Sequence, residues 1–175
     1  MKTMKSDIKK NAVFFSYSKD KEVFLALKEK ITTEATNPEM IFISSDEDSI
    51  KGGDDYIKTI KSALDNAVIV FLFITPHSHL SPWLHYEAGY AEAKGKVIIP
   101  IGIKMDIASM IAPINKIQGR NVESADDLNF LIRNINNVLK TDIDEIFTND
   151  DFVNLNEKIE ATYGIIDGGD SSIFQ

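Results

Sequence analysis

The run from Val68 to Ile74 constrains the fold most, because every residue in it is apolar. A strand with one face in water alternates polar and apolar side chains, so a wholly apolar strand is typical of a sheet that is covered on both faces. Compact apolar runs also occur at 12–15, 40–43 and 97–103. Segments with apolar residues at helical spacing separate these runs. The sequence therefore predicts an α/β fold, a flavodoxin-like doubly wound parallel sheet of about five strands with helices on both faces.

The expected helices have apolar residues three or four positions apart. They are centred on residues 23–31, 56–64, 83–93 and 128–139, with a further helix around 152–159. An acidic, glycine-containing loop is expected at 44–55, a weaker segment at 107–117 and a short edge strand at 118–122. We therefore divide the chain into a lysine-rich lead (1–10), one α/β domain (11–140) and an acidic helical appendage with a tail (141–175).

Charge and composition limit the partners of the chain. The formal net charge of -8 disfavours binding to the phosphate backbone of nucleic acid. The lysine-rich start lacks a signal-peptide core, and the apolar runs are too short to span a membrane. The chain has no cysteine, so nothing indicates an oxidising compartment. We expect a cytoplasmic protein with neither nucleic acid nor a membrane as its partner.

Several kinds of site are absent from the sequence. No glycine-rich dinucleotide fingerprint, P-loop or G-x-S-x-G serine elbow occurs. The acidic run 46–48 fails as a calcium loop because Ile50 stands where a ligand is needed. His77, His79 and His85 have no cysteine to complete a zinc site, and we expect the loop histidines to be polar, solvent-facing residues. No metal site is predicted.

The segment from Ser81 to Glu87 is the best candidate site. Ser81 is a favourable helix N-cap, and Pro82 suits the first helical position. Trp83 and Glu87 are one turn apart, so a flat ring and a carboxylate share one face of this helix. The helix follows the central apolar strand, and the carboxyl ends of strands are where such sheets bind ligands. On residue type alone, a helix glutamate such as Glu87 is usually a solvated surface residue and a tryptophan such as Trp83 usually a packing residue.

Four segments together resemble bacterial TIR domains, the Toll/interleukin-1 receptor homology fold. They are the strand end Val13–Asp20, the segment from Asp46 through Gly52 and Gly53 to Tyr56, the strands at 67–74 and 97–101, and the pattern of Ser81, Trp83 and Glu87 that matches S-x-W-x-x-x-E. The resemblance covers roughly residues 13–140, and the combination is far more specific than any one segment.

The resemblance implies an NAD+ nucleosidase, a glycohydrolase or cyclase, with NAD+ as its substrate and no cofactor. The catalytic glutamate of the family falls on Glu87. The substrate-binding positions implied are Phe15, Ser16, Tyr17, Trp83, Asp46, Lys51 and Gly52. A single carboxylate is compatible with this chemistry, because nicotinamide leaves from a ring that already carries positive charge and needs no general acid. The products would be nicotinamide with ADP-ribose, or with a cyclic or base-exchanged form.

The resemblance also implies assembly and signalling. Copies of the chain would associate through the 44–55 loop, and a cyclic product would signal to a separate effector, as in bacterial anti-phage immunity. Two other functions stay open. One is a non-enzymatic TIR adaptor that only binds other TIR domains, and the other is glycosyl transfer of the nucleoside deoxyribosyltransferase kind.

Overall fold

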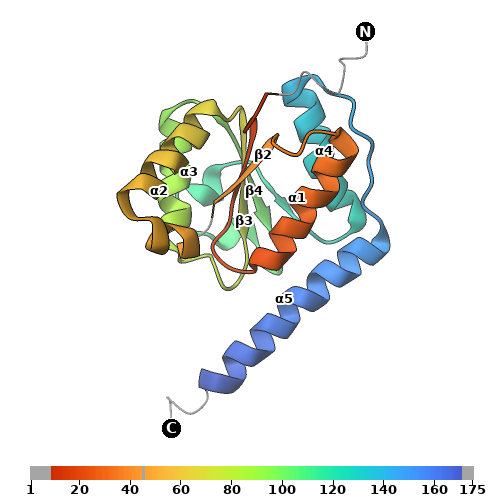
Figure 1. The fold of residues 1–175 in the computed structure, drawn as a ribbon. Helices are drawn as coiled ribbons and strands as arrows, with labels where there is room; N and C mark the ends of the chain where they lie inside the picture. The colour runs from red at the N-terminus through yellow and green to blue at the C-terminus, as the bar shows by residue number, and fades with distance from the viewer. Residues whose placement is uncertain (1–8, 45, 171–175) are drawn as a thin grey trace.

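The computed structural model describes residues 9–44 and 46–170, without the side chains of 46–52 and 163–170. Its described strands form one parallel sheet in the order β2-β1-β3-β4-β5 (Figure 1). The strands are β1 (Val13–Ser16), β2 (Ile41–Ser44), β3 (Ile69–Ile74), β4 (Val97–Gly102) and β5 (Arg120–Asn121). The predicted fold class is confirmed, and the wholly apolar strand β3 lies at the centre of the sheet.

Helices connect the strands and cover both faces of the sheet. They are α1 (Lys21–Ala35), α2 (Asp46–Asn66), α3 (Pro82–Ala93), α4 (Ala125–Leu139) and α5 (Asn149–Asp170), with short 3-10 turns η2 (Ile107–Ser109) and η3 (Ile114–Lys116) between β4 and β5. The prediction of a loop at 44–55 is wrong in one respect, because α2 already begins at Asp46. Gly53 interrupts this helix with φ 56° and ψ -142°, a conformation that glycine adopts readily.

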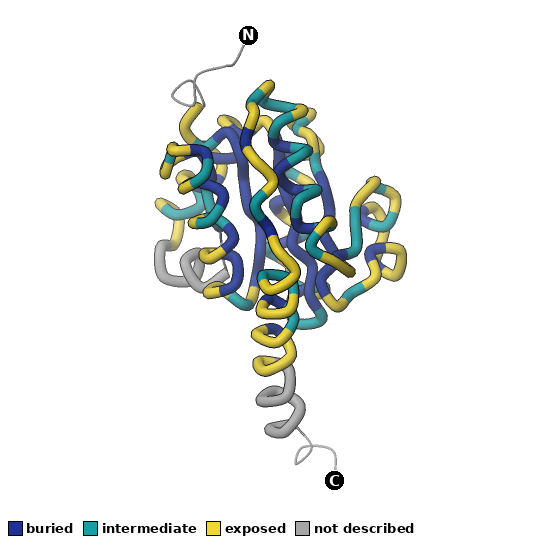
Figure 2. Tube along the Cα trace, turned by 90° about the vertical axis from the view of Figure 1, so that its right-hand side faces the viewer, coloured by how far each residue is buried: buried dark blue, intermediate teal, exposed yellow. Residues whose placement is uncertain are grey.

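Successive side chains of each strand point to opposite faces, which divides the core in two. Phe15 belongs to the cluster that packs under α1, α4 and α5. Phe14 belongs to the cluster under α2 and α3. Both clusters are closed to solvent along the sheet, as the continuous buried segments in Figure 2 show. Ser16, the last residue of β1, follows the alternation onto the α2–α3 side.

Helix α5 and the segment before it pack partly against the core, and the end of α5 projects from it. Ile143, Phe147, Leu155 and Ile159 pack in the same cluster as the central strands, so one continuous core crosses the division expected at residue 140. Beyond Ile159 the helix extends away from the sheet (Figure 1), and Glu160, Ala161 and Thr162 are exposed. Among the described helices, none combines the length and apolar character that crossing a membrane requires.

Candidate functional site at the carboxyl ends of β1 and β2

Helix α3 begins as its sequence predicts. Ser81 is the N-cap, with φ -63° and ψ 120°, and its Oγ accepts a hydrogen bond from the N–H of Leu84 at 3.4 Å. Pro82 occupies the first turn, where a missing N–H leaves no helical hydrogen bond unmade. The helix therefore starts at a defined residue directly after the loop that leaves β3, and this start determines which side chains of α3 turn toward the sheet.

Glu87 is one of those side chains, and it meets the end of β1. The Oγ of Ser16 donates to Oε1 of Glu87 at 3.3 Å, and both residues have 0% exposure. Strand β1 lies between β2 and β3. The chain moves from β1 to β2 in one direction and from β2 to β3 in the other, so β1 and β3 border the point where the strand order reverses. Open α/β sheets bind ligands at this point, beyond the carboxyl ends of the strands.

Trp83 makes a second contact between α3 and a strand end, this time at β2. Its Nε1 donates to Oγ of Ser44 at 3.2 Å, and Ser44 is the register partner of Ser16. The indole ring also stacks on Tyr86, with ring centroids 5.1 Å apart and planes 16° from parallel. Trp83 thus ties the first turn of α3 to the end of β2. One of its ring faces is already occupied by Tyr86.

The burial of Glu87 determines what this carboxyl group can do. A glutamate on a solvated helix face would be exposed, so that interpretation of Glu87 is wrong. A carboxylate removed from water interacts more strongly with a nearby positive charge, because the surroundings screen that charge less. The arrangement is therefore suited to stabilising a cation that develops beside Glu87 during a reaction.

The other predicted binding residues divide into two groups. Phe15 and Tyr17 are not brought to Glu87: their side chains pack in the opposite cluster, Phe15 against Phe73 with centroids 4.8 Å apart and Tyr17 against Phe24 at 5.1 Å. The reason is the strand alternation, which turns Ser16 one way and both neighbours the other. The side chains of Asp46, Lys51 and Gly52 lie outside the described residues.

The loop histidines differ from the expectation. His77 is not a solvent-facing residue, because its side chain is 6% exposed and its Nδ1 lies 3.2 Å from Oδ2 of Asp20, whose side chain is 1% exposed. His79 and His85 contact backbone carbonyls, of Pro76 at 3.0 Å and of His79 at 3.1 Å. Within the described part of the chain, no three histidine, aspartate or glutamate side chains gather as a metal site would require.

Sequence reasoning missed two features of this region, Ser44 and the Asp20–His77 pair. Ser44 had a readable signal, since two serines end neighbouring strands in register. The pair joins residues far apart in the chain, and its only signal was that both follow strands whose carboxyl ends meet at one edge of the sheet.

Comparison with known proteins agrees with this geometry. A family model described as TIR domain matches residues 13–132, from the first residue of β1 into α4. Among proteins with curated descriptions, none matches the chain. The matched segment contains Ser16, Ser44, Trp83 and Glu87, and it covers most of the chain. The chain therefore belongs to the TIR domain family.

Proposed function

We propose that the protein is an NAD+ nucleosidase that cleaves the bond between nicotinamide and ribose, with Glu87 as its catalytic residue. The observation that carries the proposal is the fully buried carboxyl group of Glu87, held by Ser16 at the switch point of the sheet. Membership of the TIR family, which includes NAD+-cleaving enzymes, supports the same substrate.

In the proposed reaction, the bond between ribose C1′ and the nicotinamide nitrogen breaks. Its electron pair moves to the nitrogen, so a neutral nicotinamide leaves and positive charge develops on the ribose. The carboxylate of Glu87 stabilises this charge or captures C1′ as a nucleophile. Water then adds to C1′ and loses a proton, which yields ADP-ribose. If water is excluded, a nucleophile of the same molecule captures C1′ instead and gives a cyclic product.

The role of Ser16 in this proposal is positional. Its hydroxyl donates to Oε1 of Glu87, which holds the carboxyl group at the end of β1. Trp83 supports the same turn of α3 through Ser44, and we assign it support of the site because Tyr86 occupies one face of its ring. We further propose that the protein acts in the cytoplasm, that copies assemble through the 44–55 loop, and that a cyclic product signals to a separate effector in anti-phage defence.

The test is NAD+ consumption with product identification by mass spectrometry, over a range of protein concentrations that includes conditions that force assembly. We expect Glu87→Gln to reduce kcat by about 100-fold or more, because the neutral amide cannot stabilise the developing cation. The matched control is Glu92→Gln, an exposed glutamate of the same helix, which should keep wild-type activity. Equal activity of Glu87→Gln and wild type would disprove the site.

The two alternative functions are separate outcomes of the same experiment. Consumption of deoxynucleosides without loss of NAD+ would assign glycosyl transfer to the protein. A protein that leaves NAD+ intact even when assembled, and yet captures another TIR domain, would be an adaptor.

A further inference from the structure

The carboxylate of Asp20 has an unusual orientation. Asp20 is the N-cap of α1, where an aspartate side chain normally accepts a hydrogen bond from the first turn of its helix. Here no such side-chain bond forms, and the residue has a left-handed conformation with φ 66° and ψ 42°. A positive φ is strained for a residue with a side chain, although aspartate tolerates it better than most. Both features accompany one contact, the approach of Oδ2 to Nδ1 of His77 at 3.2 Å.

The pair is enclosed by protein. The side chain of Asp20 is 1% exposed and that of His77 is 6% exposed. The two atoms lie within hydrogen-bonding distance, and a carboxylate oxygen accepts a hydrogen bond from an imidazole N–H. A charged group in such surroundings is costly unless it is paired, and removing one partner of a buried pair leaves the other uncompensated. The contact is therefore a specific link between the two loops that carry these residues.

His77 belongs to a loop with its own hydrogen-bond network. The N–H of Thr75 donates to Oγ of Ser78 at 2.9 Å, and the N–H of His77 contacts Oγ1 of Thr75 at 3.3 Å. Thr75 and Ser78 are buried. The N–H of Ser81, which caps α3, donates to the carbonyl oxygen of Ser78 at 2.9 Å. A short, hydrogen-bonded segment thus connects His77 to the start of α3, the helix that carries Glu87.

Asp20 lies in the loop that follows β1, as His77 lies in the loop that follows β3. It stands four residues after Ser16, in the connection between β1 and α1. The Asp20–His77 contact therefore joins the loop after Ser16 to the loop before Glu87. The Ser16–Glu87 hydrogen bond and the Asp20–His77 contact are two links between the same two stretches of chain.

We propose that Asp20 and His77 form a latch of positioning residues, which holds the loop before α3 against the loop after β1 and so sets Glu87 opposite Ser16. Its catalytic consequence rests on the proposed function, whereas its structural consequence does not. Loss of the latch should lower kcat more than it raises KM, because a displaced Glu87 weakens a contact needed in the transition state.

The test compares His77→Ala with His79→Ala in the full chain. His79 lies in the same loop and loses a single contact to the carbonyl oxygen of Pro76, so it controls for simple loosening of the loop. We expect His77→Ala to shift the backbone amide resonances of both Ser16 and Glu87 in 15N-labelled protein, and His79→Ala to shift neither. The conservative variant His77→Asn should restore them, since its Nδ2 can donate to Asp20 from a comparable position.

Kinetics give the second readout. We expect kcat for NAD+ to fall by about tenfold to a hundredfold in His77→Ala, with a much smaller change in KM, and to recover in His77→Asn. Equal losses in His77→Ala and His79→Ala would overturn the latch, as would unchanged amide resonances of Ser16 and Glu87. If wild type does not cleave NAD+, the proposed function fails, and the resonances still decide whether the latch exists.

Discussion

The two faces of the sheet bury different chemistry at the carboxyl ends of its strands. Under α1, α4 and α5, the strand ends carry aromatic side chains such as Phe15, Tyr17 and Phe73. Under α2 and α3, the ends of β1 and β2 instead carry the hydroxyl groups of Ser16 and Ser44, and Ser16 donates to Glu87. Apolar packing stabilises a fold, whereas a buried carboxyl group is costly in free energy. At these strand ends, the comparison therefore associates the proposed function with the α2–α3 side and stabilising apolar packing with the other.

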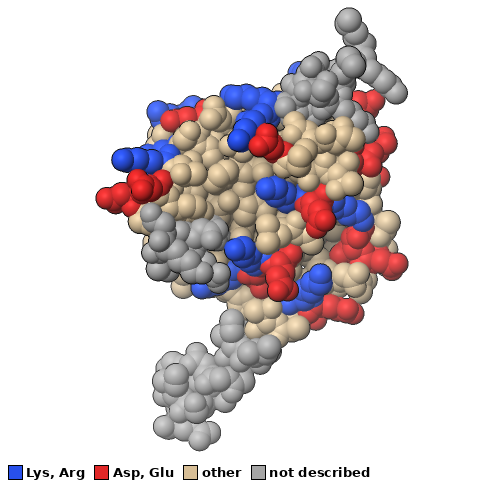
Figure 3. Space-filling model, viewed as in Figure 1, with Lys and Arg blue, Asp and Glu red and all other residues tan. Residues whose placement is uncertain are grey.

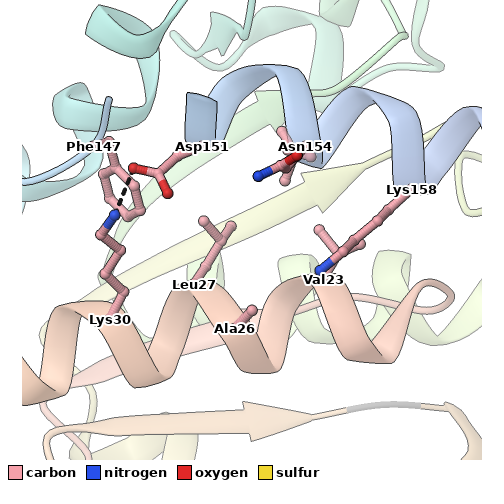
Figure 4. Close-up of a pocket in the computed structure, with 9 residues that line it drawn as sticks. Val23, Ala26, Leu27, Lys30, Phe147, Asp151, Asn154 and Lys158 are labelled. Atoms are coloured by element: carbon pink, nitrogen blue, oxygen red, sulfur yellow. Dashed lines mark hydrogen bonds and ion pairs between the residues drawn. The ribbon is translucent and has the colours of Figure 1, made fainter. Parts of the chain in front are cut away.

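The ion pair between Lys30 and Asp151 lies at the rim of the apolar side. A cavity of about 150 Å³ separates α1 from α5, and Lys30 reaches across it to Asp151, with Nζ 2.5 Å from Oδ2 (Figure 4). Apolar residues such as Val23 and Leu27 line it together with polar ones such as Asn154 and Lys158. On the face of the molecule shown in Figure 3, lysine and arginine side chains (blue) lie interspersed with aspartate and glutamate side chains (red). Lys30 and Asp151 thus pair while partly exposed to solvent, in contrast to the enclosed Glu87.

The largest predicted effect tests whether α5 belongs to the stabilising side. Ile159→Ala should lower the free energy of unfolding by about 2–5 kcal/mol, because Ile159 is fully buried against the core and the deletion leaves a cavity. Val153, which is 40% exposed on the same helix, is the control, and Val153→Ala should cost less than about 0.5 kcal/mol. Urea unfolding measures both. Equal small costs would mean that α5 does not contribute to the core, and the comparison of the two faces would lose its stabilising half.

A smaller effect is expected for Trp83, which lies at the edge of the functional side. Trp83→Phe keeps a ring to stack on Tyr86 and removes the hydrogen bond to Ser44, so it should cost about 1 kcal/mol of stability. Its effect on NAD+ cleavage should be far below that of Glu87→Gln, because we assign Trp83 a supporting role.

A double-mutant cycle isolates the Trp83–Ser44 hydrogen bond. Once Ser44→Ala has removed the acceptor, adding Trp83→Phe should change the free energy of unfolding very little. A loss of activity as large as that of Glu87→Gln in the single variant Trp83→Phe would instead place the indole in contact with substrate.

The sequence predicted the layers of this fold well, because wholly apolar strands and helically spaced apolar residues are local patterns. It also placed Trp83 and Glu87 on one helix face, since the N-cap at Ser81 sets the phase of α3. The start of α2 was misjudged: the glycines at 52 and 53 suggested a loop, although acidic residues such as Asp46 and Glu47 also suit the first turn of a helix.

Other parts of the site depend on tertiary arrangement. Alternation separates Ser16 from Phe15 and Tyr17, but only the position of α3 decides which set meets Glu87. The Asp20–His77 contact joins two loops that no local pattern connects. Sequence spacing could therefore single out Glu87 as a candidate and could not predict which groups contact it.

The smallest predicted effect concerns the ion pair at the rim of the apolar side. Burial raises the pKa of Asp151, but hydrogen bonds from Lys30 and Thr148 outweigh it and bring the pKa below its ordinary value of 3.8. Because the pKa of Asp151 is lower in the folded state, the ion pair contributes its full stability at pH values above 3.8. This contribution disappears as the pH falls through the lower folded pKa.

Because Lys30 is 37% exposed, Lys30→Met should cost only about 0.5 kcal/mol near neutral pH. Lys158→Met, in the same groove, should cost less. Urea unfolding of both variants and wild type from pH 7 down to about pH 3 should show the Lys30 difference shrinking in acid. A difference that stays constant with pH would mean that Lys30 acts through its contact with Phe147, where Nζ lies 5.6 Å from the ring centroid, rather than through the carboxylate of Asp151.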